Sequence, residues 1–171
     1  MSTINAVTLK STTIQHTNGT SALNIDSSGR VTKPNHPAFY VQRGYGNLSN
    51  FMTGGTTAIT TWDQINLNKG NHFTSANGRF TAPVAGVYLF TFHLSSSLSG
   101  TDNSDYLFYK NGGGVSETIV NKSGGVAVPW INSALIMHIN LAINDYVTLG
   151  AASYNANTGT ARASFGGCLI G

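Results

Sequence analysis

The chain has 171 residues, of which only 9% are charged, and its formal net charge is +3. An average soluble domain carries about 25% charged residues, so surface helices laced with ion pairs are disfavoured. The scattered Lys and Arg residues form no basic patch, which excludes a nucleic-acid footprint, and the single cysteine excludes an internal disulfide framework. Asn, Ser, Thr and Gly replace the missing charge and suit turns and short strands. Composition therefore predicts an all-β protein with one core domain and a short appendage.

Residues 1–36 form that appendage, which we call the arm. Its short alternating segments are separated by turns at Asn18-Gly19 and Ser27–Gly29. Each segment has too few apolar side chains to form a core by itself. A disordered arm is one interpretation. The other is an arm that pairs with its own copies or lies on another protein, and a regular recurrence of apolar residues favours it. Those residues are Val7, Leu9, Ile14, Leu23, Ile25 and Val31.

The sequence shows no sign of a targeting or membrane segment. Its start, MSTINAVTLK, lacks the apolar run of a cleaved signal peptide. No stretch approaches the ~20 apolar residues that span a bilayer. We therefore expect no membrane insertion.

The nucleus of the core domain is an aromatic strand at residues 86–94. Tyr88, Phe90 and Phe92 recur at every second position, so they share one face of an extended chain and form a broad apolar surface. Val87 and Leu89 fall on the other face, which predicts an inner strand covered on both sides. Upstream, an Asn77-Gly78 turn predicts a hairpin between Phe73 and Phe80.

Further strand signals recur at the spacing of a sandwich or barrel. We predict about ten strands and no helix in residues 37–171. In chain order the strands are 38–43, 57–60, the hairpins of 62–80, 86–94, 105–110, 114–119, 133–141, 146–152 and 163–170. The long polar loops between them are 44–55, 95–104, 120–130 and 153–162.

A set of residues in this region falls at the spacings of a known signature. The set is Trp62, Asn68, Phe73, Phe80, Gly86, Tyr88, Phe90 and Phe92. In this pattern the chain resembles the globular head of complement C1q and adiponectin-type proteins, a jelly roll related to tumour necrosis factor. Trp62 stands where that family usually has Phe, which keeps an aromatic ring in place. Other landmarks of the family are Phe39, Lys110–Gly112, Asn144–Val147 and Ser164–Leu169.

The resemblance implies a ten-stranded jelly roll over residues 37–171 that assembles as a homotrimer. Separately, the segment from Thr20 to Pro34 resembles the N-terminal segments of phage virion proteins that carry such heads. The collagen-like Gly-x-y stem of the animal proteins is absent, which argues against a complement-type role.

Residues suited to catalysis are few. Glu117 and five Asp residues are the only carboxylates, and no nucleophile elbow, phosphate-binding glycine loop or zinc-type His/Cys spacing is present. An enzyme is therefore disfavoured, and no catalytic residue or cofactor is predicted. His93 and His138 lie on predicted strands, where we expect buried, hydrogen-bonded rings. Cys168 is expected to be a small buried apolar side chain.

One loop gathers side-chain oxygen atoms of the kind that calcium prefers. Its carboxylates are Asp102 and Asp105, which are weak candidate ligands. The Gly and terminal Glu of an EF-hand are missing, and a solvated turn is the simpler explanation.

The long loops are the predicted binding surface. If the first and last strands have their outer ends beside the arm, consecutive antiparallel strands place the short turns at 82–85, 111–112 and 144–145 at that base. The long loops then lie at the far end, and recognition usually lies in loops on a rigid scaffold. Solvated loop tips are the alternative, and Trp130 could instead pack within a trimer. The candidate binding residues are Tyr45, Asn47, Asn103, Trp130, Tyr154 and Asn155.

Together these features lead to a functional hypothesis. The chain would be a trimeric structural protein of a virion surface, attached to other virion proteins through residues 1–36. Its head would form the tip of a tail or head fibre that binds a host-surface glycan or protein. A capsid decoration or stabilising protein is one alternative, and a free extracellular glycan- or protein-binding module is another.

Overall fold

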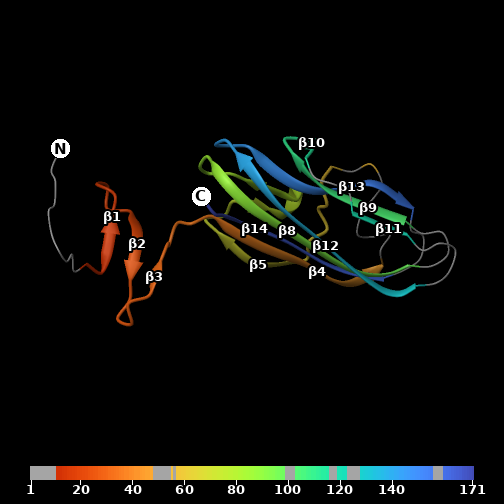
Figure 1. Cartoon of the computed structure of the whole chain (residues 1–171), viewed down its shortest axis with the longest axis horizontal. Coiled ribbons are helices and arrows are strands. Elements are labelled where there is room, and N and C mark those ends of the chain that lie inside the picture. The colour runs from red at the N-terminus through yellow and green to blue at the C-terminus, as the bar shows by residue number, and fades with distance from the viewer. Residues whose placement is uncertain are drawn as a thin grey trace. The chain divides into compact units, whose positions relative to one another are not determined.

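The computed structural model describes residues 11–47, 55, 57–98, 103–115, 119–122, 128–155 and 160–171. The chain divides into two compact units, Met1–His36 and Pro37–Gly171, which we call the arm and the head. Figure 1 labels their elements along the chain.

The described part of the arm is a three-stranded antiparallel sheet. Its strands are β1 (Thr13–Gln15), β2 (Ser21–Ile25) and β3 (Val31–Thr32). Asp26 holds the turn between the last two strands, because its carboxylate accepts hydrogen bonds from the backbone of Ser28 and Arg30 and pairs with the Arg30 guanidinium at 2.7 Å. None of the described arm residues is fully buried, so this sheet has no core of its own.

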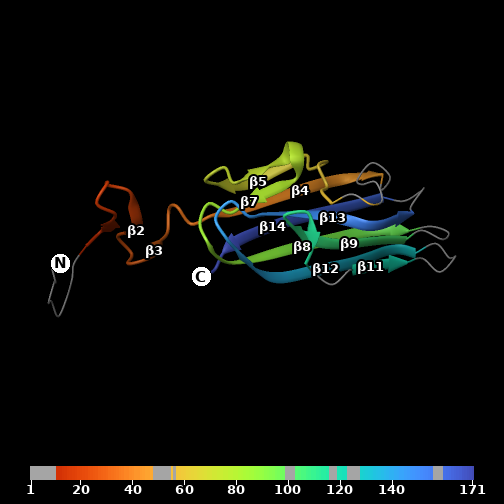
Figure 2. The ribbon, with the colours of Figure 1, turned by 90° about the horizontal axis from the view of Figure 1, so that it is seen from above.

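The head is a sandwich of two antiparallel sheets, whose layers separate in Figure 1, and Figure 2 shows the strands of the five-stranded sheet side by side. The five-stranded sheet has the order β12 (Val128–Leu141), β8 (Gly86–Leu98), β14 (Thr160–Leu169), β4 (Ala38–Asn47) and β5 (Gln64–Lys69). The other sheet has the order β10 (Gly113–Gly114), β9 (Asn103–Lys110), β13 (Tyr146–Asn155), β7 (Arg79–Thr81) and β6 (Phe73–Thr74), and β11 (Ile119–Lys122) also pairs with β9.

The core between the sheets consists largely of aromatic rings. Phe90 and Phe92 point inward from β8 and meet rings of the opposite sheet, with centroids 6.0 Å from Phe108 and 5.2 Å from Tyr106 respectively. Phe39 of β4 stacks on Phe73 at 4.9 Å. The predicted inward row of alternating rings is therefore confirmed, and its members are fully buried.

The predicted hairpin between Phe73 and Phe80 is also confirmed, because these two residues are register partners in β6 and β7. Between the strands lies a single 3-10 turn, Ser75–Asn77, and Gly78 follows in the left-handed conformation at φ 61°. Asn68 explains its place in the signature: its side-chain amide donates to the Phe73 carbonyl at 2.8 Å and accepts from the Phe73 N–H at 3.0 Å. Both backbone groups at the start of the hairpin are thus satisfied by one side chain.

Several strands run further than the sequence predicts. At the far end Asn47 pairs with Thr160, Val128 with Leu98, and Asn103 with Asn155. These positions are polar or lack alternation, but strand pairing uses the backbone, so a neighbouring strand can extend them. In consequence all six candidate binding residues lie on strand ends rather than in loops: Tyr45, Asn47, Asn103, Trp130, Tyr154 and Asn155.

Other strand predictions need correction as well. Residues 57–60 form no strand, although Ile59 is buried and its N–H donates to the Leu149 carbonyl at 2.8 Å. The predicted strand at 114–119 is divided between β10 and β11, and residues 116–118 lie outside the described part. The described head residues form eleven strands instead of about ten, because two-residue strands such as β6 and β10 are too short to leave a sequence pattern.

The expectation that β8 is covered on both faces is wrong for the single chain. β8 lies between β12 and β14 within its sheet, but only the face of Tyr88, Phe90 and Phe92 meets the second sheet. Val87 remains exposed and Leu89 is half-buried on the opposite face. In a two-layer sandwich each sheet is covered on one side only. We call the uncovered side of the five-stranded sheet, which carries Val87 and Leu89, the outer face.

Candidate functional site

Three short turns meet at one end of the head, as the alternation of strands predicts. The Asn144 N–H donates to the Ala82 carbonyl at 2.9 Å. The Asn111 amide donates to the Asp145 carboxylate at 2.7 Å, and the Lys110 ammonium lies 2.9 Å from the same carboxylate. These hydrogen bonds, led by that from Asn111, lower the pKa of Asp145 to about 2. The network fixes this end, which we call the base.

The candidate binding residues lie at that far end but are divided between the sheets. Tyr45, Asn47 and Trp130 belong to the five-stranded sheet, whereas Asn103, Tyr154 and Asn155 belong to the other. The side chains of Asn47, Asn103, Tyr154 and Asn155 lie outside the described part of the structure. Their role in binding stays a prediction.

Tyr45 and Trp130 come together, although two strands, β8 and β14, separate β4 from β12. Their ring centroids are 6.2 Å apart, and the side chains remain 63% and 44% exposed. The strands between them present small side chains here, among them Ser97 and Thr160, whose hydroxyl groups lie 3.1 Å apart. The Arg162 guanidinium lies 5.5 Å from the centre of the Tyr45 ring, within the range of a cation–π contact.

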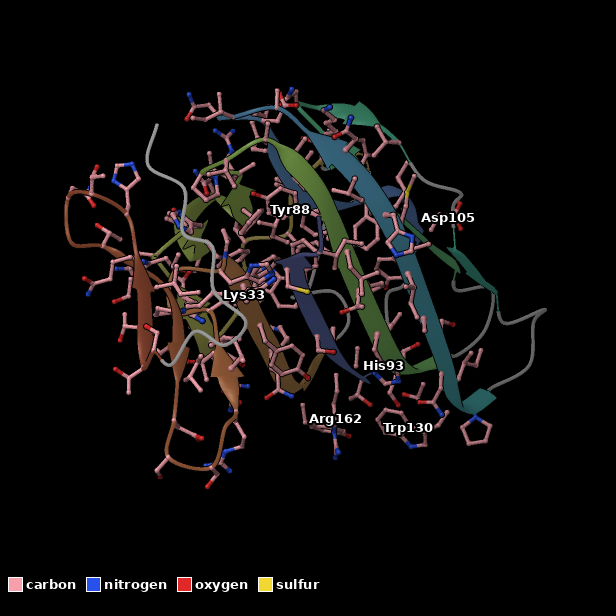
Figure 3. All side chains as sticks on the ribbon, turned by 60° about the vertical axis from the view of Figure 1, so that its left-hand side comes forward. Lys33, Tyr88, His93, Asp105, Trp130 and Arg162 are labelled. Carbon is pink, nitrogen blue, oxygen red and sulfur yellow. The ribbon has the colours of Figure 1, made fainter. Side chains whose placement is uncertain are left out.

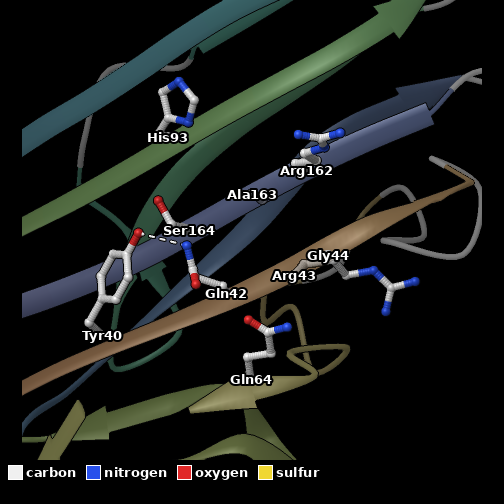
Figure 4. Close-up of a pocket in the computed structure, with 9 residues that line it drawn as sticks. All are labelled: Tyr40, Gln42, Arg43, Gly44, Gln64, His93, Arg162, Ala163 and Ser164. Atoms are coloured by element: carbon white, nitrogen blue, oxygen red, sulfur yellow. Dashed lines mark hydrogen bonds between the residues drawn. The ribbon is translucent and has the colours of Figure 1, made fainter. Parts of the chain in front are cut away.

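A pocket of about 290 Å³ adjoins this cluster on the outer face. Figure 4 shows the lining side chains of β4, β8 and β14, with Arg43 directed away from Tyr40 and His93. The Gln42 amide donates to the Tyr40 hydroxyl at 3.1 Å, and the Arg43 guanidinium donates to the Thr61 carbonyl at 2.8 Å. The lining residues are Tyr40, Gln42, Arg43, Gly44, Gln64, His93, Arg162, Ala163 and Ser164.

No sequence pattern predicts this pocket, because its residues come from four strands distant in sequence. His93 was expected to be buried, and that expectation is wrong: it is exposed at the pocket, with Ser164 as its register partner on β14. His138 is exposed as well. The strict alternation after Phe92 was the available signal, because a residue next to an inward ring must point outward.

Cys168 also differs from expectation. It is only half-buried and pairs with Leu89, so it belongs to the outer face rather than the core. The calcium candidate is not assembled in the described residues: Asp102 lies outside them, and Asp105 is on β9. Across the residues described, no group of three or more His, Cys, Asp or Glu side chains is placed to hold a metal ion.

Two further pKa shifts arise from burial away from the pocket. Burial lowers the pKa of His72, because the charged imidazolium is penalised, and raises the pKa of Tyr88, because the phenolate is penalised. The Tyr88 hydroxyl donates to the Val84 carbonyl at 2.9 Å, near the base.

Comparison with known proteins decides the family. The C1q domain model matches residues 38–170, which is most of the chain. The chain belongs to the C1q domain family. Among its relatives are complement C1q and tumor necrosis factor-related protein 9A of Homo sapiens, 47% identical over 34 residues, and protein 9 of Mus musculus, 50% identical over 34 residues. Each match covers 20% of this chain and only 10% of the relative.

Two solved structures share the fold of this C1q domain. The globular domain of zebrafish complement 1qA covers 80% of this chain and 98% of its own, with a TM-score of 0.59 and 21% identity. The Eiger TNF of S. frugiperda covers 80% and 93%, with a TM-score of 0.51 and 10% identity. At such identities the likeness establishes the jelly-roll fold alone, as the signature residues predict.

The family also sets a general class of role. C1q and TNF-like domains are generally non-enzymatic binding or structural modules, and they typically form homotrimers. In the part of the chain that is described, we find no helix of the length and apolar character that crossing a bilayer requires.

Proposed function

We propose that this chain is a homotrimeric, non-catalytic display protein whose C1q head presents a recognition surface and whose arm attaches it to a larger particle. The observation that carries the proposal is the uncovered outer face of the five-stranded sheet. Apolar side chains of three strands and of the residues after β14 are exposed there in a single chain, and an exposed apolar patch marks an interface. They are Leu67, Val87, Ile136 and Ile170. We call them the apolar patch.

A second copy is the occupant that best fits this patch. Its members come from β5, β8, β12 and the C-terminal residues after β14, so a complementary copy would cover the full width of the sheet. A three-fold arrangement closes on itself and leaves no copy with an open patch. The homotrimers typical of the family support the same arrangement.

We place the trimer on the surface of a virion, as a fibre head that attaches to a host-surface glycan or protein. The arm supports this placement, because none of its described residues is fully buried and such short strands need a partner surface. Its resemblance to N-terminal segments of phage virion proteins points the same way. The alternatives are a capsid decoration or stabilising protein and a free extracellular glycan- or protein-binding module, and both would use the same head.

Ile136→Asp tests the assembly, with Ile143→Asp as the matched control. Both isoleucines are similarly exposed, at 67% and 61%, but Ile136 lies on the sheet and Ile143 in the turn at the base. A charge buried at the patch without a partner costs far more than the interface can supply. We expect Ile136→Asp to sediment as a folded monomer and Ile143→Asp as a trimer. A wild-type chain that is monomeric at micromolar concentration would refute the assembly.

Location needs a separate measurement. Electron microscopy of purified virus particles with an antibody against residues 37–171 should label the outer surface, and removal of residues 1–36 should abolish the label. If the freed head binds host cells, attachment is supported over decoration. Protein found only in particle-free medium would favour the extracellular module.

A further inference from the structure

The described strands of the arm carry all of their Ile, Leu and Val side chains on one face. Leu23 and Ile25 are two positions apart on β2, so they point to the same side of the sheet. Register pairing adds one residue from each neighbouring strand, because Ile14 is opposite Leu23 and Val31 is opposite Ile25. We call these four residues the arm face.

The opposite side of the same sheet is polar. Three register neighbours lie there, one from each strand: Thr13, Asn24 and Thr32. The arm face has no such character and remains open in the single chain, where Ile14 is 45% and Val31 59% exposed and the other two members are half-buried. An exposed apolar face on so small a sheet marks a contact surface.

The arm face is too small to hold two free arms together. Its four aliphatic side chains are far fewer than the roughly 20–30 residues that each partner contributes to a stable interface. Three arm faces closed about one axis pool four side chains from each copy and cover all three faces at once. Such a closure supplies the core that the arm sheet lacks alone.

The short connection to the head keeps the arms of the other copies close. Five residues, Lys33–Pro37, join β3 to the head strand β4, and an extended chain of that length reaches at most roughly 18 Å. Lys33, the first of them, is labelled in Figure 3. Three arms carried by one head trimer are therefore present at an effective concentration that is roughly millimolar. Each arm meets the other two before it meets a different protein.

Charge does not oppose contact between the arms. The three described strands of the arm contain no charged residue. Asp26 and Arg30, in the turn between β2 and β3, form an ion pair with each other at 2.7 Å. Copies can thus approach face to face without bringing like charges together.

We propose that the arm face binds the arm faces of two further copies, so that three arms share one apolar core. The inference rests on the proposed function, since the head trimer must hold the arms together, and it names the partner of the arm face. Attachment to the particle is then left to the strand edges. β1 and β3 are the edge strands of the arm sheet, and an edge strand offers its backbone groups to another chain.

The reactivity of an introduced thiol in the full chain tests the inference. Val31→Cys places a thiol on the arm face, and Thr32→Cys, the matched control, places one on the opposite side of the same strand. Both variants also carry Cys168→Ala, which removes the single native thiol. In the trimer we expect a maleimide to modify Val31→Cys more slowly than Thr32→Cys, roughly tenfold or more, because the arm face is covered. Mass spectrometry measures both rates.

The same variants combined with Ile136→Asp, which is expected to be monomeric, identify the occupant. If other arms cover the face, protection is lost in the monomer and Val31→Cys reacts as fast as Thr32→Cys. Protection that persists in the monomer would mean that the head of the same chain covers the arm face, and would overturn the proposal. Full reaction of Val31→Cys in the free trimer would also overturn it, and protection on purified particles alone would then assign the face to another virion protein.

A charge on the arm face gives a second readout. Val31→Asp should raise the protein concentration at which the trimer dissociates by roughly tenfold or more, since three carboxylates would meet in one apolar core. Thr32→Asp should leave that concentration unchanged. Equal dissociation of the two variants would contradict a core shared by three arms. A trimer with an unprotected arm face refutes this inference alone, whereas a monomeric wild-type chain refutes the assembly and the inference together.

Discussion

The two faces of the five-stranded sheet are made by alternate residues of the same strands, yet they differ in almost every physical property. The inner face of β8 carries Tyr88, Phe90 and Phe92, which are fully buried among other rings. The outer face of the same strand carries Val87 and His93, which are exposed. The inner face is therefore complete within one chain, and the outer face is not.

The inner face therefore stabilises the fold, and the outer face is available for assembly or binding. Packing on the inner face is satisfied by the second sheet, so its residues are committed to stability. The outer face carries the apolar patch and the adjoining pocket, and among the described residues of the head neither has an occupant. Substitutions on the inner face should therefore change unfolding, whereas those on the outer face should change assembly or binding.

Phe90→Ala, compared with its outer-face neighbour Thr91→Ala, should show the largest contrast. The Phe90 ring contacts rings of both sheets, with centroids 5.7 Å from Phe80 and 6.2 Å from Phe165, so its removal leaves a cavity. We expect a loss of about 3–5 kcal/mol in the free energy of unfolding. Thr91→Ala should cost about 0.5 kcal/mol or less. Urea denaturation at one fixed protein concentration measures both, and similar losses in the two variants would contradict the distinction between the faces.

The inner face was largely predictable from sequence, and the outer face was not. Alternation alone places Tyr88, Phe90 and Phe92 together, because period two is a local property of the chain. The pocket needs β4, β5, β8 and β14 to be adjacent, and sheet order is set by long-range pairing that leaves no local pattern. The sequence predicts Tyr45 and Trp130 as candidate binding residues, but their contact depends on the small residues between them.

A smaller contrast is expected at two adjacent glycines of β14. A Cβ atom at Gly167 would lie 2.7 Å from Cδ1 of Phe90 and 2.9 Å from Cε1 of Phe39, inside the ring cluster. A Cβ atom at Gly166 would lie 3.1 Å from Cδ2 of Tyr40 and 3.2 Å from the Phe39 carbonyl oxygen, which are longer separations than those at Gly167.

We therefore expect Gly167→Ala to lose about 1–3 kcal/mol through overpacking. Gly166→Ala should lose less, since the restriction of the unfolded chain offsets part of the strain. Thermal unfolding followed by near-ultraviolet circular dichroism reports the packing of the rings directly. If Gly166→Ala proved the more damaging of the two, the outer face would be as tightly packed as the inner one.

Asp145→Asn should change the free energy of unfolding least among these variants. Asp145 lies in a turn at the base, so its substitution alters neither face of the sheet. Its pKa of about 2 in the folded chain is below the ordinary value of 3.8, so the carboxylate stabilises the fold fully above about pH 4. This contribution is lost as the pH falls through about 2, where both states are protonated. The stability difference between wild type and Asp145→Asn should thus be constant above pH 4 and shrink towards pH 2.

Asp26→Asn is the control. The pKa of Asp26 is also lowered, chiefly by hydrogen bonds from Arg30, but Asp26 lies in the arm, so its substitution should leave the unfolding of the head unchanged. A difference that persisted undiminished at pH 2 would mean that Asp145 acts through the shape of the turn rather than through its charge.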